Sequence, residues 1–199
     1  IAAHYFAGLT NGPGYADVIL ADSPIGYWRL NEPKKVQSTS VIANSSALGA
    51  AANGAVFGGL NSVTGGLTSP LVADANTAMG FTQVGPAYSL PTGGMIDVPN
   101  NAALNTPSYS VECWARMDSW ANAHQSPVTS RFSAGGTNQG FILYAAPVTV
   151  TGQYTSLPRW EFWSGVGDTW NMVNAGGIDV ATNKWTHLVG TYDAESRVM

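Results

Sequence analysis

The alternation of apolar and polar positions is clearest in residues 108–117, S-Y-S-V-E-C-W-A-R-M. One set of positions is Val111, Cys113, Ala115 and Met117, and the other is Ser110, Glu112, Trp114 and Arg116. Because successive side chains of a strand point to opposite faces, this pattern predicts a strand with a dry face and a mixed face. We expect it to be a central strand of a sheet.

Shorter stretches of the same kind recur along the chain and are separated by Gly, Pro, Asn and Ser. The further strand candidates are residues 26–30, 41–42, 55–57, 71–72, 78–81, 95–98, 128–132, 140–144, 159–164, 170–173 and 185–192. A helix is predicted over residues 15–21, which end just before Asp22-Ser23-Pro24, where proline disfavours helix. Many short strands and almost no helix predict an all-β fold, a two-sheet antiparallel jelly-roll sandwich with a short N-terminal helix.

Both ends of the chain suggest pieces of a longer array. Residues 1–7, I-A-A-H-Y-F-A, are apolar and run into the linker-like L-T-N-G-P-G. Residues 197–199 resemble the beginning of a further strand that has no hairpin partner. We therefore expect residues 1–14 to be the tail of a preceding domain plus a linker. Residues 15–199 would then form one jelly roll whose last strands are missing.

Composition excludes some classes of partner. The 199 residues carry a net charge of −4, only 10% are charged, and no run of Lys and Arg occurs. Nucleic acid is not expected as a partner, because phosphate binding needs clustered basic residues. No apolar stretch approaches the ~20 residues of a membrane-spanning helix. The single cysteine, Cys113, lies on the dry face and is expected to be a buried small hydrophobe.

Candidate catalytic residues are sparse. Glycan hydrolysis needs two carboxylates, which on a strand would lie two or four residues apart on one face. Glu112 and Glu161 each lack such a partner on their strands, so no enzyme is expected. We expect Glu112 to pair with Arg116 or with a neighbouring strand, and His187 to have a structural role.

Two weaker signals concern binding. Acidic residues at strand ends are calcium candidates, since Ca²⁺ prefers several oxygen ligands, and no other cofactor is expected. These residues are Asp97, Asp118, Asp168 and Asp193, with Asp179 at a further strand end. Exposed aromatic rings are the other signal, because they offer large rigid apolar area to a ligand. The candidates in or beside loops are Trp120, Tyr154 and Trp170, whereas Trp28, Trp114 and Trp185 are expected in the core.

Three runs carry a family resemblance. They are A-D-S-P-I-G-Y-W-R-L-N-E (21–32), V-P-N-N-A-A-L-N-T-P-S-Y-S-V-E-C-W-A-R-M (98–117) and K-W-T-H-L-V-G-T-Y-D (184–193). The chain resembles the laminin G-like, concanavalin A-like jelly-roll domains of bacterial cell-surface, secreted and phage virion proteins. Residues 1–8 are similar to the closing segment of such a domain, which implies a tandem array.

The resemblance implies a non-catalytic binding or adhesion module that is extracellular, on a cell surface or in a virion. Its partner would be a carbohydrate, a surface protein, or other copies and neighbouring domains of the same chain. One alternative is a structural subunit of a filament, sheath or virion, assembled through its open ends. The other is a glycan hydrolase, since the fold hosts both lectins and glycanases.

Overall fold

The computed structural model describes residues 2–10, 14–33, 36–58, 62–72, 74–82, 93–120, 124–150 and 153–199. Within these ranges, the side chains of residues 148–150, 153–157 and 175–179 are not described. The chain divides into two compact units, unit 1 (Ile1–Asn105) and unit 2 (Thr106–Met199). Each unit has its own hydrophobic core.

The helix predicted near the N-terminus of unit 1 is confirmed with its bounds. Helix α2 (Tyr15–Ala21) buries Tyr15 and Ile19, which lie on one side of the helix. It ends at the C-cap residue Asp22, two residues before Pro24. The local signals were sufficient here, because an apolar stripe and a proline stop coincide.

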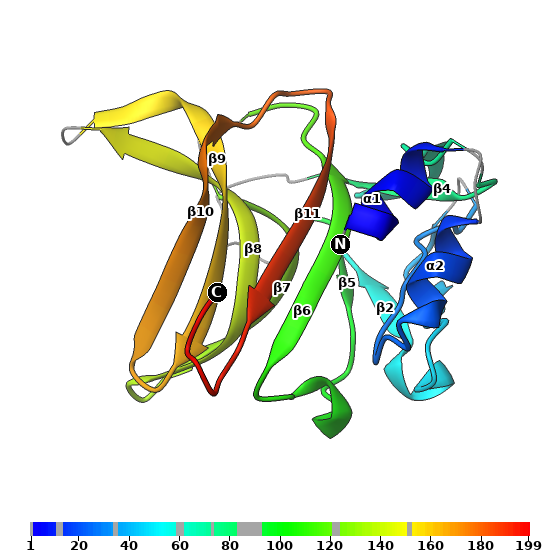
Figure 1. Ribbon diagram of the computed structural model, residues 1–199. Coiled ribbons are helices and arrows are strands. Elements are labelled where there is room, and N and C mark those ends of the chain that lie inside the picture. Colours follow the sequence, from blue (N-terminus) through cyan, green and yellow to red (C-terminus); the bar gives the residue numbers. More distant parts are fainter. Residues whose placement is uncertain are drawn as a thin grey trace. The chain divides into compact units, whose positions relative to one another are not determined.

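A second helix was not predicted from the sequence. Helix α1 (Ala2–Leu9) packs beside α2 (Figure 1), and its His4 Nε2 lies 3.0 Å from Asp22 Oδ2. An eight-residue helix is marginal alone, so the contact with α2 is what stabilises it. The division between residues 1–14 and 15–199 stays a prediction.

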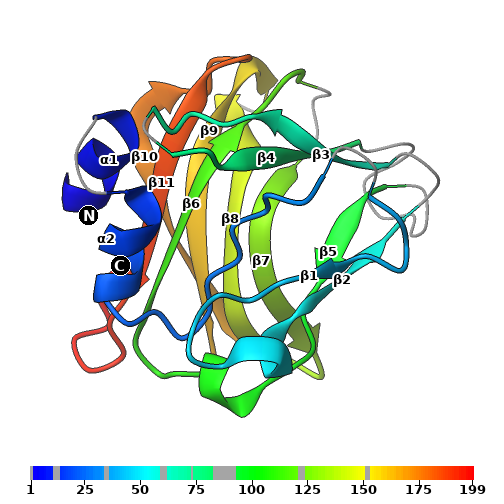
Figure 2. The same ribbon diagram turned by 90° about the vertical axis from the view of Figure 1, so that its right-hand side faces the viewer.

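The strands of unit 1 form two small sheets around a compact core (Figure 2). One sheet has the order β1-β2-β5 and the other pairs β3 with β4. Their bounds are β1 (Val41–Ile42), β2 (Gly54–Phe57), β5 (Met95–Asp97), β3 (Val63–Thr68) and β4 (Thr77–Phe81). Single turns of 3-10 helix lie at η1 (Gly49–Ala52) and η2 (Ala102–Leu104). The core consists of Ile42, Val56, Val63 and Met79.

The strand predicted over residues 71–72 is wrong, since these residues belong to no strand. The strand predicted over residues 26–30 is wrong as well. In this stretch Trp28 makes only an isolated bridge with Asn44. The amide of Tyr27 donates instead to the side-chain oxygen of Asn44, at 2.8 Å. Trp28 packs against the unit 1 core as expected, and its Nε1 donates to the carbonyl of Ala52 at 2.7 Å. Side-chain acceptors therefore replace the ladder that an alternating pattern alone would suggest.

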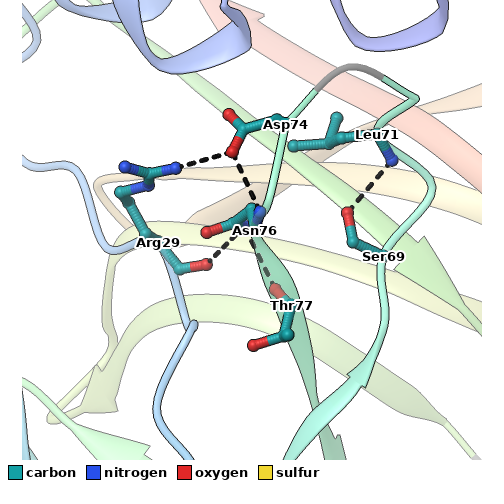
Figure 3. A network of polar contacts seen from close by, with 6 residues as sticks. All are labelled: Arg29, Ser69, Leu71, Asp74, Asn76 and Thr77. Atoms are coloured by element: carbon teal, nitrogen blue, oxygen red, sulfur yellow. Dashed lines mark hydrogen bonds and ion pairs between the residues drawn. The ribbon is translucent and has the colours of Figure 1, made fainter.

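A polar network fastens this irregular segment to the loop before β4 (Figure 3). Arg29 Nη2 lies 2.9 Å from Asp74 Oδ1, which also accepts the amide of Asn76. The side-chain amide of Asn76 donates back to the carbonyl of Arg29 at 3.1 Å. Only 12% of the Asp74 side chain is exposed, so the ion pair with Arg29 is largely shielded from water. The network holds two segments of unit 1 together.

Unit 2 is a sandwich of two antiparallel sheets, as predicted (Figure 1). Strand β6 pairs with β11 along their whole length, and a four-stranded sheet has the order β10-β9-β8-β7. The bounds are β6 (Tyr109–Arg116), β7 (Gln125–Ala134), β8 (Thr137–Val150), β9 (Gln153–Val166), β10 (Thr169–Asp179) and β11 (Trp185–Tyr192). Among the described residues β6 pairs with β11 alone, so the expectation of a central strand was wrong.

The core of unit 2 lies between its two sheets. Its buried residues are Ala115, Met117, Leu143, Ala145, Trp160, Phe162, Val180, Leu188 and Tyr192. The predicted dry face of β6 is thus confirmed, and Cys113 packs against this core. Burial raises the pKa of the Cys113 thiol to about 12, and the nearby Glu112 carboxylate adds to the effect. Gly190 allows close approach of the sheets, since a Cβ there would overlap the ring of Phe162.

The later strands are longer than the alternation predicts. Strands β7 and β8 extend to a two-residue turn at Gly135 and Gly136, whose φ angles are +58° and +78°. Positive φ at both positions suits a tight hairpin, and glycine adopts it without strain. Pro147 and Pro158 face each other in the register of β8 and β9, beside a register shift. These two prolines, a residue type that usually occurs in loops, therefore lie inside strands.

No helix in the described part of the chain is both long and apolar enough to cross a bilayer.

Candidate functional site

The candidate site lies on the outer face of the four-stranded sheet, meaning the side opposite the unit 2 core. Leu143 and Phe162 are opposite each other in the register and point into the core. Side chains one position along must point the other way. Ile142 opposite Trp163 and Tyr144 opposite Glu161 therefore belong to the outer face. The two-stranded sheet of β6 and β11 covers only the inner face.

Aromatic rings form a stripe across this outer face. The ring centroids of Tyr144 and Trp163 are 6.1 Å apart with an interplanar angle of 32°, and His124 meets Tyr144 edge-on at 4.9 Å. Trp163 and Tyr144 are half-buried, so each presents part of its ring. The indole Nε1 of Trp163 donates to Glu161 Oε2 at 2.9 Å, which fixes the ring orientation. Ile142, opposite Trp163 in the register, is only 7% exposed, so it adds little surface for a ligand.

A further aromatic residue, Trp170, lies on the same face. The register places Arg131, Gly140, Gly165 and Trp170 side by side on β7, β8, β9 and β10. Since neither glycine has a side chain, Arg131 can reach across the sheet, and its Cζ lies 6.0 Å from the centroid of the Trp170 ring. This is within the range of a cation–π contact. Trp170 is half-buried and Arg131 is exposed.

This arrangement can bind a flat, hydroxyl-rich ligand. Partly exposed rings stack on the apolar faces of sugars, and Glu161, Asn174 and Arg131 provide acceptors and donors beside them. Asn174 is opposite Glu161 in the register, and Met172 is opposite Trp163. The face thus combines apolar area with polar groups at its margin, as small-molecule sites generally do.

On the other sheet, Glu112 and His187 form a pair. Glu112 Oε1 lies 2.8 Å from His187 Nε2, with exposed side-chain fractions of 19% and 5%. His187 is opposite Trp114 in the register, and their rings lie 4.9 Å apart. Pairing of Glu112 with the neighbouring strand is thereby confirmed, and His187 is hydrogen-bonded as expected. Arg116 engages Asp118 rather than Glu112.

A shallow, open depression of about 560 Å³ lies where β6 begins and β11 ends. Its lining is rich in hydroxyl groups and consists of Ser108, Tyr109, Ser110, Thr191, Tyr192, Asp193, Ser196 and Val198. Hydrogen bonds from the Ser196 hydroxyl and the Glu195 amide hold the pKa of the exposed Asp193 carboxyl below its usual value. These bonds shape the turn after β11.

A family model described as the concanavalin A-like lectin/glucanases superfamily, of the laminin G type, matches residues 90–199. The match spans more than half of the chain and includes every strand of unit 2. The chain belongs to this superfamily. A search of curated proteins and a search of solved structures gave no significant match. The similarity noted for residues 21–32 lies outside the matched part and remains a prediction.

The predicted ligand-binding aromatics of this laminin G-like domain have different surroundings. Trp170 lies on the outer face beside Arg131. Trp120 packs against the unit 2 core, and its Nε1 is buried. Tyr154 faces Thr149 in the β8–β9 register, but its side chain lies outside the described ones.

Neither Trp163 nor Tyr144 was predicted to bind a ligand. The signal that could have found the pair is the alternation itself, because it places Tyr144 on one face of β8 and Trp163 with Glu161 on one face of β9. Trp114 and Trp185 also differ from expectation. They lie on the face of β6 and β11 that points away from the unit 2 core.

The three calcium candidates of unit 2 are dispersed rather than gathered. Asp97 is exposed at the end of β5 in unit 1. In unit 2, Asp118 pairs with Arg116 at one end of the β6–β11 ladder, and Asp193 lies at the other end. Asp168 sits in the β9–β10 turn and accepts the Thr169 hydroxyl at 3.0 Å. Within the described residues no three His, Cys, Asp or Glu side chains form a metal cluster. The calcium site stays a prediction.

Proposed function

We propose that this laminin G-like domain is a non-catalytic module that binds carbohydrate on the outer face of the β7–β10 sheet. The observation that carries the proposal is the stripe of Tyr144 and Trp163, fixed by Glu161 and continued by Trp170. The membership in a superfamily that includes lectins is consistent with it. An extracellular, cell-surface or virion location is part of the same proposal.

A binding role is favoured over hydrolysis by the surroundings of Glu161. Retaining and inverting glycosidases need a second carboxylate within roughly 5 to 10 Å. The positions two residues away on β9 are Arg159 and Trp163, and the opposite positions are Tyr144 and Asn174. None of these side chains is a carboxylate, and the side chain of Asp179, which is opposite Arg159 in the register, lies outside the described ones. Glu112, on the other sheet, is engaged by His187.

The experiment is a glycan array followed by isothermal titration with the best ligand. Trp163→Ala should weaken binding by up to about tenfold, because an aromatic contact contributes about 0.5–1.5 kcal/mol beyond the area it buries. Trp163→Phe should keep much of the affinity, since a ring remains. Trp185→Ala is the matched control, since Trp185 is also half-buried but lies on the other sheet.

Two results would contradict the proposal. One is the absence of binding to any glycan by a folded protein. The other is binding that Trp163→Ala and Trp170→Ala leave unchanged. Release of reducing sugar that is abolished by Glu161→Gln would instead support the glycan hydrolase alternative.

A further inference from the structure

Two arginines of unit 2 lie over tryptophan rings, and among the described residues only one of the two has a carboxylate partner. Arg116 Cζ lies 5.2 Å from the Trp185 ring centroid, and Arg131 Cζ lies 6.0 Å from that of Trp170. Arg116 also donates from Nε and Nη2 to Asp118, at 2.7 and 3.3 Å. Its charge is therefore neutralised within the protein.

Arg131 has no such partner in the described part of the chain. No hydrogen bond or ion pair joins its guanidinium to an acidic side chain there. Asp168, in the β9–β10 turn, accepts the Thr169 hydroxyl with its carboxylate, and its carbonyl accepts the side-chain amide of Asn138. The cation on the outer face is thus left for a ligand to neutralise.

The surroundings also hold Arg131 in place. Strands β7 and β10 are separated by two others, so Arg131 and Trp170 start roughly 14 Å apart at their backbones. The contact forms because Gly140 and Gly165 leave the intervening row free of side chains. A Cβ on Gly140 would overlap the carbonyl of Ser130, so this gap is required by the backbone itself. A guanidinium stacked on a ring keeps its N–H donors directed outward in its own plane.

We infer that the outer face takes a saccharide bearing an anionic group, a carboxylate or a sulfate, which Arg131 binds through charge-assisted hydrogen bonds. The inference rests on the proposed function and names its ligand class. Sugar rings stack on Trp163 and Tyr144, while the acidic substituent meets Arg131 beside Trp170. Planar paired donors suit both carboxylate and sulfate oxygens, and such bonds are stronger than neutral ones.

The test compares each acidic ligand with its uncharged counterpart by isothermal titration. One pair of probes is a galacturonate oligosaccharide and its methyl ester, and the other is a sulfated galactan oligosaccharide and its desulfated form. The acidic member of at least one pair should bind about tenfold to a hundredfold more tightly, the range expected for charge-assisted hydrogen bonds. The pair that shows the difference identifies the acidic group.

Three variants locate the effect. Arg131→Gln should remove the preference for the acidic probe, measured as the ratio of the acidic to the neutral affinity. Arg131→Lys should recover only part of it, because an ammonium lacks the planar fork. Arg116→Gln, the stacked arginine already paired with Asp118, should leave the preference intact.

The outcomes separate this inference from the proposal beneath it. If neutral and acidic probes bind equally and both depend on Trp163, the inference is overturned and the proposed function stands. An acidic preference that survives Arg131→Gln also overturns it. If no probe binds the folded protein, the inference and the proposed function both fail.

Discussion

The two faces of the β7–β10 sheet are built from the same strands and differ in how deeply their aromatic side chains are buried. On the inner face Leu143 and Phe162 are 3% and 4% exposed and belong to the unit 2 core. On the outer face Tyr144 and Trp163 occupy the next positions and are only half-buried. Period-2 alternation thus separates a packing surface from a binding surface within one sheet.

Aromatic content alone therefore does not identify a binding site. Trp160 and Trp163 lie three residues apart on β9, yet Trp160 is in the core and Trp163 stands on the outer face. The two residues are an odd number of positions apart, so alternation along the strand places them on opposite faces. Burial on the inner face stabilises the sandwich through the hydrophobic effect, whereas the rings outside keep area for a ligand.

The largest effect is expected from truncation of an inner-face ring. Phe162→Ala should lower the free energy of unfolding by about 3–5 kcal/mol, because it leaves a cavity between the sheets. Met172→Ala is the outer-face control. Met172 is 41% exposed, so its loss should cost about 1 kcal/mol or less. Urea denaturation of both variants gives the comparison, and equal losses would contradict the assignment of faces.

The thiol of Cys113 reports whether the space between the sheets is closed. Its pKa is raised to about 12, so the thiol remains protonated at ordinary pH. At pH 8 a thiol reagent should react about a thousandfold more slowly with the native protein than with the protein in urea, since the thiolate is the nucleophile. Comparable rates in the two states would show that solvent enters the core.

A smaller loss of stability is expected when a methyl group is added at Gly190, where the two sheets approach each other closely. The Gly190→Ala methyl would overlap the ring of Phe162, and overpacking of this kind costs about 1–3 kcal/mol. Gly136→Ala is the control for backbone strain without crowding, because a Cβ there has no neighbour within 4 Å although φ is +78°. In thermal unfolding, adding Phe162→Leu should restore part of the stability lost in Gly190→Ala and none of the stability lost in Gly136→Ala.

The smallest effect concerns the exposed turn after β11. The pKa of Asp193 is lowered in the folded protein, so its contribution to stability is present above the unfolded value of about 3.9. That contribution is lost as the pH falls through the lower folded value. Asp193→Asn should therefore reduce the acid sensitivity of unfolding slightly below pH 4. An unchanged pH profile between pH 2 and 5 would contradict this.

Local pattern predicted much of the framework. The bounds of α2 and β11 follow from the sequence, because a proline stop and an uninterrupted alternation are local signals. The segment around Trp28 was misread as a strand, since its hydrogen bonds go to the side chain of Asn44, seventeen residues away. Helix α1 was missed for a related reason, because it is stabilised by its contact with α2.

The candidate site depended more on long-range pairing. Alternation assigns Tyr144 and Trp163 each to one of two faces, but it does not say that they are neighbours, because register is a property of two strands. The contact between Arg131 and Trp170 is even harder to predict from the sequence. It requires three correct registers and two glycines in the same row, none of which a single stretch of sequence contains.

The all-β class, the superfamily and the dry face of residues 108–117 follow from the amino-acid sequence, because each depends on local periodicity and residue type. The contacts made on the opposite faces depend on how distant strands are brought together. Glu112 turned out to be bound by His187 from a strand 75 residues away, and Arg131 was left without an acidic partner in the described part of the chain. Charge pairing is settled by distance in space, and sequence separation carries little information about that distance.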